Sequence, residues 1–336
     1  MNELEKINFS FIIPVYNRPD EIDELLKSMT LLEGNITFEV VVVEDGSNLK
    51  CDEVCDKYKT HLDISYFFKS NSGPGSSRNF GMQKAKGNYY IILDSDCILP
   101  PQYMLAVSNF LTAEFVDCFG GPDADRADFS DIQKAINFTM TSFITTGGIR
   151  GGSEAISKFQ PRSFNMGLSK KAFEATTGFG NIHPGEDPDL TLRLWKQGFE
   201  TKLIPLAFVY HKRRIDWNKF YIQVYKFGKA RPILNLWHPA YTKPTFWLPT
   251  LFLSGFILAV LMAVFSNYLL LQLYLVYFFL VFFGAVMATK NIKIAFYTII
   301  TTGIQFYGYG LGFAKSYYKL FIKKQKPEQA MSEMFF

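Results

Sequence analysis

The chain after residue 245 contains three long segments without Asp, Glu, Lys or Arg. They cover residues 246–265, 268–289 and 294–314. A helix of about 20 apolar residues crosses the hydrocarbon core of a bilayer, whereas a core helix of a soluble protein normally keeps a polar stripe. The first two segments therefore predict membrane spans. The third is a weaker candidate because it also holds threonines, a glutamine and several glycines.

Basic residues gather on both sides of these segments. The two clusters are Lys212, Arg213, Arg214, Lys219, Lys226, Lys229, Arg231 and Lys243 before them, and Lys315, Lys319, Lys323, Lys324 and Lys326 after them. Basic flanks favour the cytoplasmic face of the cell (inner) membrane and its anionic headgroups. Three crossings would put the two clusters on opposite sides. Either the third segment is re-entrant or interfacial, or the basic tail after it breaks the rule that basic flanks stay on the cytoplasmic side.

Other classes of protein fit the composition poorly. The basic residues lie beside the apolar segments, and no recognition motif accompanies them, so nucleic acid is not an expected partner. Residues 1–8 are polar and do not read as a signal peptide. The four cysteines (Cys51, Cys55, Cys97, Cys118) complete no zinc set. Reduced thiols in a cytosolic domain are expected.

The polar part of the chain alternates strand and helix patterns. Apolar runs at 9–15, 38–43, 64–68 and 89–93 predict strands, and the stretches 19–31, 51–58 and 74–86 predict helices. A further strand is expected at 163–168 and a helix at 171–176. Strands that are apolar throughout predict an α/β fold with a mostly parallel sheet covered on both faces. The glycine-rich stretch 145–160 is expected to be either a lid or a linker.

Polar residues follow three of these strands at their carboxyl ends. Tyr16 and Asn17 come after the first strand, Asp45 after the second, and Asp94 and Asp96 after the fourth. The carboxyl edge of such a sheet is where ligands bind. No G-x-G-x-x-G and no P-loop motif is present, so a dinucleotide or P-loop site is not predicted.

Asp94-Ser95-Asp96 closes the buried run Tyr89–Leu93. Two carboxylates at a strand end suggest a divalent cation and a phosphate-bearing ligand, because an unpaired buried charge is costly. The alternative is an acidic turn in which one Asp caps the next segment.

A second acidic element is Gly185-Glu186-Asp187-Pro188. Asp187 before a proline suits a helix N-cap with Pro188 at the first helical position. A carboxylate at a helix start also suits a general base, and the pattern favours neither. His211 ends a strand-like run. A lone histidine is usually structural, but imidazole with the Asp96 carboxylate would suit Mn²⁺.

Taken together, these motifs resemble the inverting glycosyltransferases of family 2, which have the GT-A fold. The resemblance covers residues 8 to about 232. It rests on the segments Phe11–Arg18, Glu44–Ser47 and Gly73–Gly81, on Asp94-Ser95-Asp96 as the D-x-D element, on Glu186-Asp187 as the E-D element, and on His211 as the distal histidine.

The resemblance implies a site for a nucleotide-sugar donor linked to UDP, GDP or dTDP. Asp45 would bind the base with Arg78 nearby, Tyr16 would pack on the ring, and Asp94 would contact the ribose or sugar. Asn165 would line the acceptor or sugar site. The implied donor-binding set is Pro14, Tyr16, Asn17, Asp45, Arg78, Asp94, Ser95 and Asn165.

The resemblance also implies the catalytic groups. Asp96 and His211 would hold Mn²⁺ or Mg²⁺ against the diphosphate. Asp187, with Glu186 beside it, would deprotonate the acceptor hydroxyl in a single inverting displacement. Processive synthases of the family carry Q-x-x-R-W, whereas Gln223–Phe227 has neither the Arg nor the Trp. This departure favours addition of a single sugar.

The expected organisation is a GT-A domain at 1–232, a juxtamembrane segment at 233–245, membrane segments at 246–314 and a basic cytoplasmic tail at 315–336. The first hypothesis is a transferase acting on a lipid-linked or cell-envelope glycan. The second is a polyprenyl-phosphate glycosyltransferase, in which a phosphate oxygen attacks. The third is an inactive scaffold subunit of a glycan assembly complex.

Overall fold

The computed structural model describes residues 6–124, 130–146, 159–211 and 216–336. The chain forms two compact units, Met1–Arg126 with Ser157–Lys212 and Phe336, and Ala127–Ile156 with Arg213–Phe335. The described residues 130–146 and 216–232 thus belong with the C-terminal helices. The expected domain boundary at residue 232 stays a prediction.

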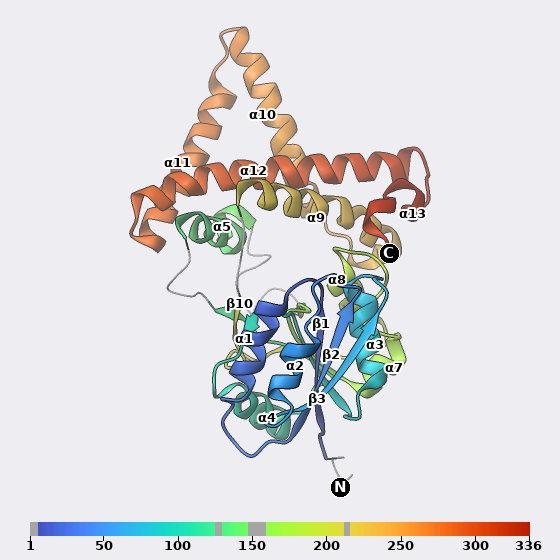
Figure 1. Ribbon diagram of the computed structural model, residues 1–336. Helices are drawn as coiled ribbons and strands as arrows, with labels where there is room; N and C mark the ends of the chain where they lie inside the picture. Colours follow the sequence, from blue (N-terminus) through green and yellow to red (C-terminus); the bar gives the residue numbers. More distant parts are fainter. Residues whose placement is uncertain (1–5, 125–129, 147–158, 212–215) are drawn as a thin grey trace. The chain divides into compact units, whose positions relative to one another are not determined.

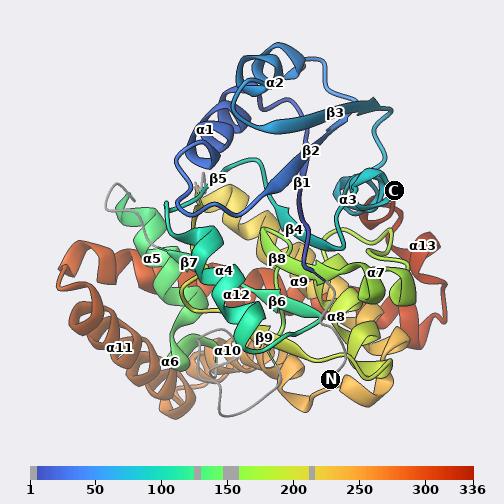
Figure 2. The same cartoon turned by 90° about the horizontal axis from the view of Figure 1, so that it is seen from below.

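The first unit is built on a seven-stranded sheet (Figures 1 and 2). Strands β3, β2, β1 and β4 run parallel, β8 is antiparallel to β4 and β6, and β9 is parallel to β6. In sheet order the strands are β3 (Asp63–Lys69), β2 (Phe38–Asp45), β1 (Phe9–Val15), β4 (Tyr89–Leu93), β8 (Asn165–Ser169), β6 (Cys118–Gly120) and β9 (Thr201–Leu203). The expected α/β fold with a mostly parallel sheet is confirmed.

Helices cover both faces of this sheet, as the apolar strands require. Alternate residues of β1 enter two separate cores: Phe11 and Ile13 pack with α1, and Ile12 packs with α3 and α8. Figure 2 shows α1 and α2 on one side of β1–β3 and α3 on the other. The helices are α1 (Pro19–Met29), α2 (Asp52–Tyr58), α3 (Pro74–Lys84), α4 (Tyr103–Ala113), α7 (Lys170–Thr176) and α8 (Glu186–Lys196).

A second, three-stranded sheet adjoins the D-x-D element. It consists of β5 (Cys97–Ile98), β10 (Val209–His211) and β7 (Asp123–Ala124) in that order. The register pairs Cys97 with His211 and Asp123 with Val209. Residues distant in sequence are thereby brought to the end of β4.

The second unit consists of helices. They are α5 (Asp131–Thr141), α6 (Phe143–Thr146), α9 (Trp217–Trp237), α10 (Leu248–Val264), α11 (Leu269–Thr289), α12 (Ile292–Tyr317) and α13 (Pro327–Ala330), with short turns at Pro239–Tyr241, Pro244–Trp247, Tyr318–Ile322 and Ser332–Met334. Figure 1 shows α10 and α11 as a hairpin standing on α12, with α9 and α5 along the other side of α12.

Two helices among the described residues are long and apolar enough to cross a membrane, Pro244–Val264 and Leu269–Thr289. They match the first two expected spans. The expected third segment, 294–314, lies inside α12, which does not meet that test. The glycine-rich stretch was expected at 145–160, and its residues 147–158 lie outside the described residues.

Most expected elements of the first unit are confirmed, with shifts at their ends. Strands 9–15 and 89–93 have the expected limits. Strand β2 extends beyond the expected 38–43, because Glu44 and Asp45 continue the ladder opposite Phe68 and Lys69 of β3. The Asp45 side chain therefore leaves from the last residue of the strand.

Gly167 of β8 provides a test of this packing. It lies opposite Phe119 of β6, and a Cβ there would approach the Phe119 ring to 2.0 Å. Gly167→Ala should destabilise the protein by about 1–3 kcal/mol through overpacking, measured by thermal unfolding in detergent. Gly303→Ala is the matched control, because no heavy atom lies within 4 Å of that position. Equal melting temperatures for both variants and the wild type would contradict this account of β6 and β8.

Candidate active site

The loop after β1 is joined to the loop after β2 through Asn17. Asn17 has a positive φ of 53°, a conformation that Asn tolerates better than most residues. Its backbone N–H donates to the Ser47 hydroxyl at 2.7 Å, and its side-chain oxygen accepts from the N–H groups of Asn48 and Leu49. The expected ligand residue Asn17 thus shapes the rim. Tyr16 beside it is 51% exposed and open to a ligand.

Asp45 is buried and fixes the start of α3. Its Oδ1 accepts from the Ser72 N–H at 3.0 Å and from the Lys69 ammonium, and its Oδ2 accepts from the Gly73 N–H at 3.0 Å. A carboxylate oxygen has two acceptor sites, and Oδ2 uses one of them for the Gly73 N–H. The Lys69 contact was not expected from the sequence.

Arg78 of α3 is buried and joins the two acidic elements. Its Nη2 donates to Asp94 Oδ1 at 2.7 Å, and its Nη1 donates to Glu186 Oε1 at 3.4 Å. The guanidinium carbon lies 5.3 Å from the centroid of the Phe179 ring, within the range of a cation–π contact. Arg78 is thus placed among carboxylates. The position near the nucleotide base that the resemblance implies stays a prediction.

Asp96 faces a different arginine. Arg18 Nη1 donates to Asp96 Oδ2 at 2.9 Å and also pairs with Glu21 at 3.1 Å. Ser95 is buried between the two aspartates. The D-x-D element therefore carries a guanidinium at each carboxylate, Arg78 at Asp94 and Arg18 at Asp96. The Arg18 contact was also missed from the sequence.

The donor set at this rim fits a divalent cation. Carboxylate oxygens are the preferred ligands of Mg²⁺ and Mn²⁺, and the Asp94 side chain is 33% exposed. The strand register sets the His211 backbone opposite Cys97, the residue after Asp96. Among the described residues, no three His, Cys, Asp or Glu side chains lie close enough to hold a metal. Mg²⁺ sites commonly combine one or two carboxylates with substrate phosphates, and the residues here suit that arrangement.

Helix α8 begins two residues earlier than the cap pattern indicated. Gly185, with φ of 133°, is the N-cap, and Glu186 and Asp187 both lie in the first turn. The expectation that Asp187 caps the helix is therefore wrong. A glycine can adopt this φ without strain, so Pro188 is not the first helical residue. Asp187 is partly buried, and its Oδ1 has no hydrogen-bond partner among the described residues.

The two adjacent carboxyls have opposite electrostatic surroundings. Burial alone would raise the pKa of Glu186, but the contact of its Oε1 with His183 Nδ1 at 2.9 Å and the charge of Arg78 lower it to about 2. Burial and the negative charge of Glu186 raise the pKa of Asp187 to about 6. Environments that push neighbouring pKa values apart are typical of acid–base sites. His183 was not anticipated, because its role depends on a contact and not on a motif.

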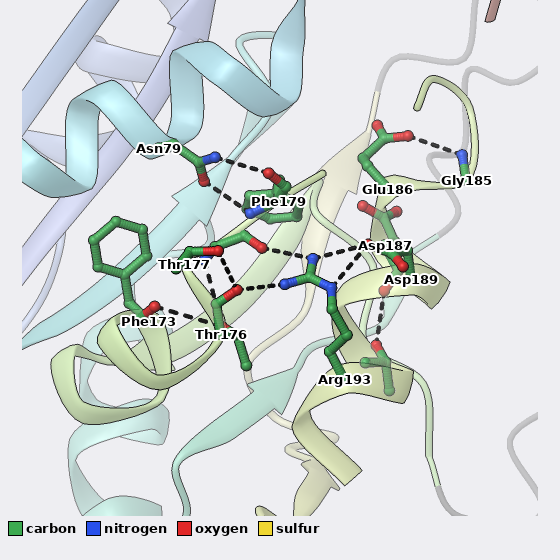
Figure 3. A network of polar contacts seen from close by, with 12 residues as sticks. Asn79, Phe173, Thr176, Thr177, Phe179, Gly185, Glu186, Asp187, Asp189 and Arg193 are labelled. Carbon is green, nitrogen blue, oxygen red and sulfur yellow. Dashed lines mark hydrogen bonds and ion pairs between the residues drawn. The ribbon is translucent and has the colours of Figure 1, made fainter. Parts of the chain in front are cut away.

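A network around Arg193 holds α8 in place (Figure 3). Asp189 and Arg193, four residues apart on α8, form an ion pair, with Arg193 Nη2 at 2.8 Å and Nε at 3.0 Å from Asp189 Oδ2. Arg193 also donates to the backbone oxygens of Thr176, the last residue of α7, and of Gly178. These bonds fix the first turn of α8 relative to the loop that precedes it.

Asn165 lies at the start of β8 and is fully buried. Its Oδ1 accepts from the Tyr103 hydroxyl at 2.7 Å, and its Nδ2 donates to the Ala207 carbonyl at 2.8 Å. These bonds connect β8 with α4 and with the segment before β10. Its expected place in the acceptor or sugar site stays a prediction. Pro14 lies within β1, opposite Val43.

The opposed pKa shifts predict opposite effects on stability. The pKa of Asp187 is higher in the folded protein than in the unfolded chain, so the folded protein binds this proton more tightly. Ionisation of Asp187 therefore lowers the free energy of unfolding as the pH rises from about 4 to about 6. Asp187→Asn should therefore be more stable than the wild type at pH 8, by on the order of 1–2 kcal/mol, and no more stable near pH 4. Thermal unfolding of the purified protein at pH 4, 6 and 8 measures this.

Glu186→Gln is the paired variant with the opposite sign. The lowered pKa of Glu186 means that its carboxylate stabilises the fold above about pH 4.5 and loses that effect as the pH falls toward about 2. The variant should therefore melt below the wild type at pH 8. Shifts of the same sign for both variants would refute the assignment.

Comparison with known proteins agrees with this arrangement. The family model described as glycosyl transferase family 2 matches residues 10–177. An uncharacterised glycosyltransferase of Rickettsia conorii is 40% identical over 93 residues, 28% of this chain and 15% of the relative. The poly(ribitol-phosphate) β-N-acetylglucosaminyltransferase TarS of Staphylococcus aureus is 32% identical over 114 residues, 33% of this chain and 20% of TarS. The chain thus matches a fifth or less of these relatives.

A solved structure extends the likeness to most of the fold. The mannosyltransferase PcManGT of Pyrobaculum calidifontis, solved with GDP-Man and Mn²⁺, aligns over 90% of this chain and 88% of its own, with a TM-score of 0.57 and 15% identity. At that identity the likeness shows the fold alone, a GT-A domain. Because the family model covers half of the sequence, the chain belongs to glycosyl transferase family 2.

Proposed function

We propose that this glycosyltransferase is a membrane-anchored, metal-dependent, inverting enzyme. It moves one sugar from a nucleotide-sugar to a hydroxyl of a lipid-linked or cell-envelope glycan. The observation that carries the proposal is Asp187. Its carboxyl lies at the first turn of α8, with a buried, unpartnered Oδ1 among the described residues and a pKa raised to about 6. A base is most effective when its pKa lies near the working pH.

In this mechanism Asp187 takes the proton of the acceptor hydroxyl as that oxygen attacks the anomeric carbon. Glu186 is a positioning residue, because His183 and Arg78 hold its carboxylate ionised beside Asp187. Asp45 and Tyr16 bind the nucleotide, and Asp94 orients the ribose or sugar. Asp96 and His211 would hold Mn²⁺ or Mg²⁺, which would supply positive charge beside the diphosphate of the donor.

The donor class follows from the family and from the rim. PcManGT is named for a complex with GDP-Man and Mn²⁺, and the rim described here offers a carboxylate for a base and two more beside the expected diphosphate. UDP-, GDP- and dTDP-linked sugars all remain candidates. A donor panel with Mn²⁺, scored by binding and slow hydrolysis, would identify the nucleotide.

The acceptor proposal rests on the apolar helices and on one relative. TarS is named for transfer to poly(ribitol-phosphate). The candidate spans Pro244–Val264 and Leu269–Thr289 would keep the enzyme at the membrane where lipid-linked acceptors lie. Basic residues on both flanks favour the cytoplasmic side of the inner membrane. Intact Asp94, Asp96 and Asp187 argue against an inactive scaffold.

A polyprenyl-phosphate acceptor is the second candidate, because the same apolar helices would also bring a lipid phosphate to the enzyme. A phosphate oxygen is already ionised at neutral pH and needs no general base. The two candidates therefore differ in their need for Asp187.

Asp187→Asn and Asp96→Asn should separate the chemical step from donor binding. Asp187→Asn should lower kcat about 10²- to 10⁴-fold and leave donor binding unchanged. Asp96→Asn should abolish Mn²⁺-dependent donor binding. Asp56→Asn, at an exposed site on α2, is the control. Calorimetry measures binding of the nucleotide-sugar donor, and a transfer assay measures kcat. Loss of donor binding in both site variants would contradict the proposal that Asp187 is the base and Asp96 a metal ligand. Full transfer activity of Asp187→Asn would indicate a phosphate acceptor.

The pH dependence of kcat/KM provides a separate test of Asp187. Activity should rise with pH through about 6, because the base must be ionised. Glu186→Gln removes the negative charge that raises the pKa of Asp187, so its acid limb should move to lower pH by about one unit. An acid limb that stayed in place in Glu186→Gln would show that Glu186 does not act on the base through its charge.

A further inference from the structure

Helices α10 and α11 present an apolar surface that the rest of the chain leaves open. No Asp, Glu, Lys or Arg occurs between Lys243 and Lys290. Within the two helices, which the structure describes in full, the buried residues are Ala259, Val281 and Ala285. Both spans are 21 residues long with mean hydropathy above 2. That length matches the hydrocarbon core of a bilayer, about 30 Å.

The turn between the two helices carries no charged residue. Ser266, with φ of 60°, and Asn267 reverse the chain, and the Asn267 side chain accepts from the N–H of Leu269. Phe265 is 84% exposed and Val264 is 74% exposed. A soluble helical hairpin would normally carry charged residues at such a tip. This tip is suited to passing through lipid.

Helix α12 is held by protein contacts along its length. Thr301 Oγ1 lies 2.5 Å from Thr139 Oγ1 of α5. The Gly312 position lies against the backbone oxygen of Tyr225, and the Gly228 position against that of Tyr309. Small residues therefore let α9 and α12 approach closely. At about 39 Å, α12 is long enough to span, but it buries hydroxyls and glycines against its neighbours.

The outer face of α12 carries a single apolar stripe. Its members, spaced at helical intervals, are Ile292, Phe296, Ile300, Tyr307 and Leu311, each between 37% and 62% exposed. Gly303 lies on the same face, with nothing near it. The Phe296 ring lies 5.0 Å from that of Phe282 in α11. The stripe therefore continues from the foot of the hairpin along α12.

We infer that a lipid bilayer covers both surfaces: α10 and α11 cross it as a hairpin, and α12 lies along the membrane surface with its stripe in the acyl boundary. The chain before Lys243 and the chain after Lys290 then share one side. The inference deepens the membrane anchoring proposed above. It also explains why both flanks of the apolar region are basic, since an even number of crossings returns the chain to the same side.

Charged and aromatic residues lie where the inference places the boundary between the bilayer and water. Lys243, Lys290 and Lys293 are exposed and bracket the feet of the hairpin. Trp247 packs on Phe313 and Tyr317, with ring centroids 4.9 Å and 4.6 Å apart. Lysine near anionic headgroups and aromatic rings at the interface are typical of membrane boundaries. A protein partner would not require these features at the ends of helices of bilayer length.

Single cysteines report the number of crossings. Ser266→Cys lies at the tip, Gln325→Cys after α12, and Lys57→Cys on α2, all at exposed positions; the four native cysteines are buried. An impermeant maleimide, applied to right-side-out and inverted vesicles, should label Lys57→Cys and Gln325→Cys from one side and Ser266→Cys from the other. Labelling of Gln325→Cys from the side that labels Ser266→Cys would mean that α12 crosses. Labelling of all three from one side would mean that nothing crosses.

A dye on Ile300→Cys reports the position of α12. In nanodiscs with brominated lipid, its fluorescence should fall at least twofold, while the same dye on Lys57→Cys should be unaffected. An unquenched Ile300→Cys would overturn the placement of α12, even if the hairpin crosses. Neither experiment measures sugar transfer, so a failure here is distinct from a failure of the proposed chemistry.

Discussion

The buried guanidinium of Arg78 is the contact on which the site depends. Removing a charge from water is costly unless it is paired and hydrogen-bonded, and Arg78 meets Asp94 on one side and Glu186 on the other. One residue of α3 thus connects the end of β4 with the first turn of α8. The two acidic elements, about 90 residues apart in sequence, share one positive charge and cannot move independently of it.

This shared charge also explains how two neighbouring carboxyls come to differ. Glu186 faces His183 and Arg78, whereas the Asp187 carboxyl is desolvated and faces the negative charge of Glu186. The result is an ionised carboxylate beside one with a pKa raised to about 6. Ionisation of Asp187 lowers the stability of the fold. The network around Arg193 holds α8, the helix that carries Asp187, in place. Stability is commonly given up in this way at functional sites.

Much of the fold could be predicted from the sequence because it depends on local patterns. The runs at 9–15 and 89–93 are apolar throughout, and both are central strands. The start of α8 was misplaced because a favourable Asp-Pro cap pattern competed with Gly185, whose positive φ allows an earlier start. Local propensity could not decide between them.

The partners within the site were not predictable, because they are set by tertiary contacts. Lys69 at Asp45 and His183 at Glu186 belong to no motif. Arg18 ends the segment Phe11–Arg18, but nothing in that segment indicates its contact with Asp96. The third apolar segment was ambiguous for a related reason. Its threonines and glycines suit both a membrane helix and a close helix–helix contact, and only the packing of α12 on α9 shows the second.

The pairing of α9 with α12 has a consequence for how the chain assembles. These helices lie directly before and after the hairpin, and the hydroxyl of Ser316 donates to the Lys229 carbonyl across their contact. The hairpin is therefore an insertion between two helices that hold each other. The contact closes only after both are made, by which time the whole apolar insertion has left the ribosome. The closing of α9 on α12 would accordingly fix the two ends of the apolar hairpin beside each other.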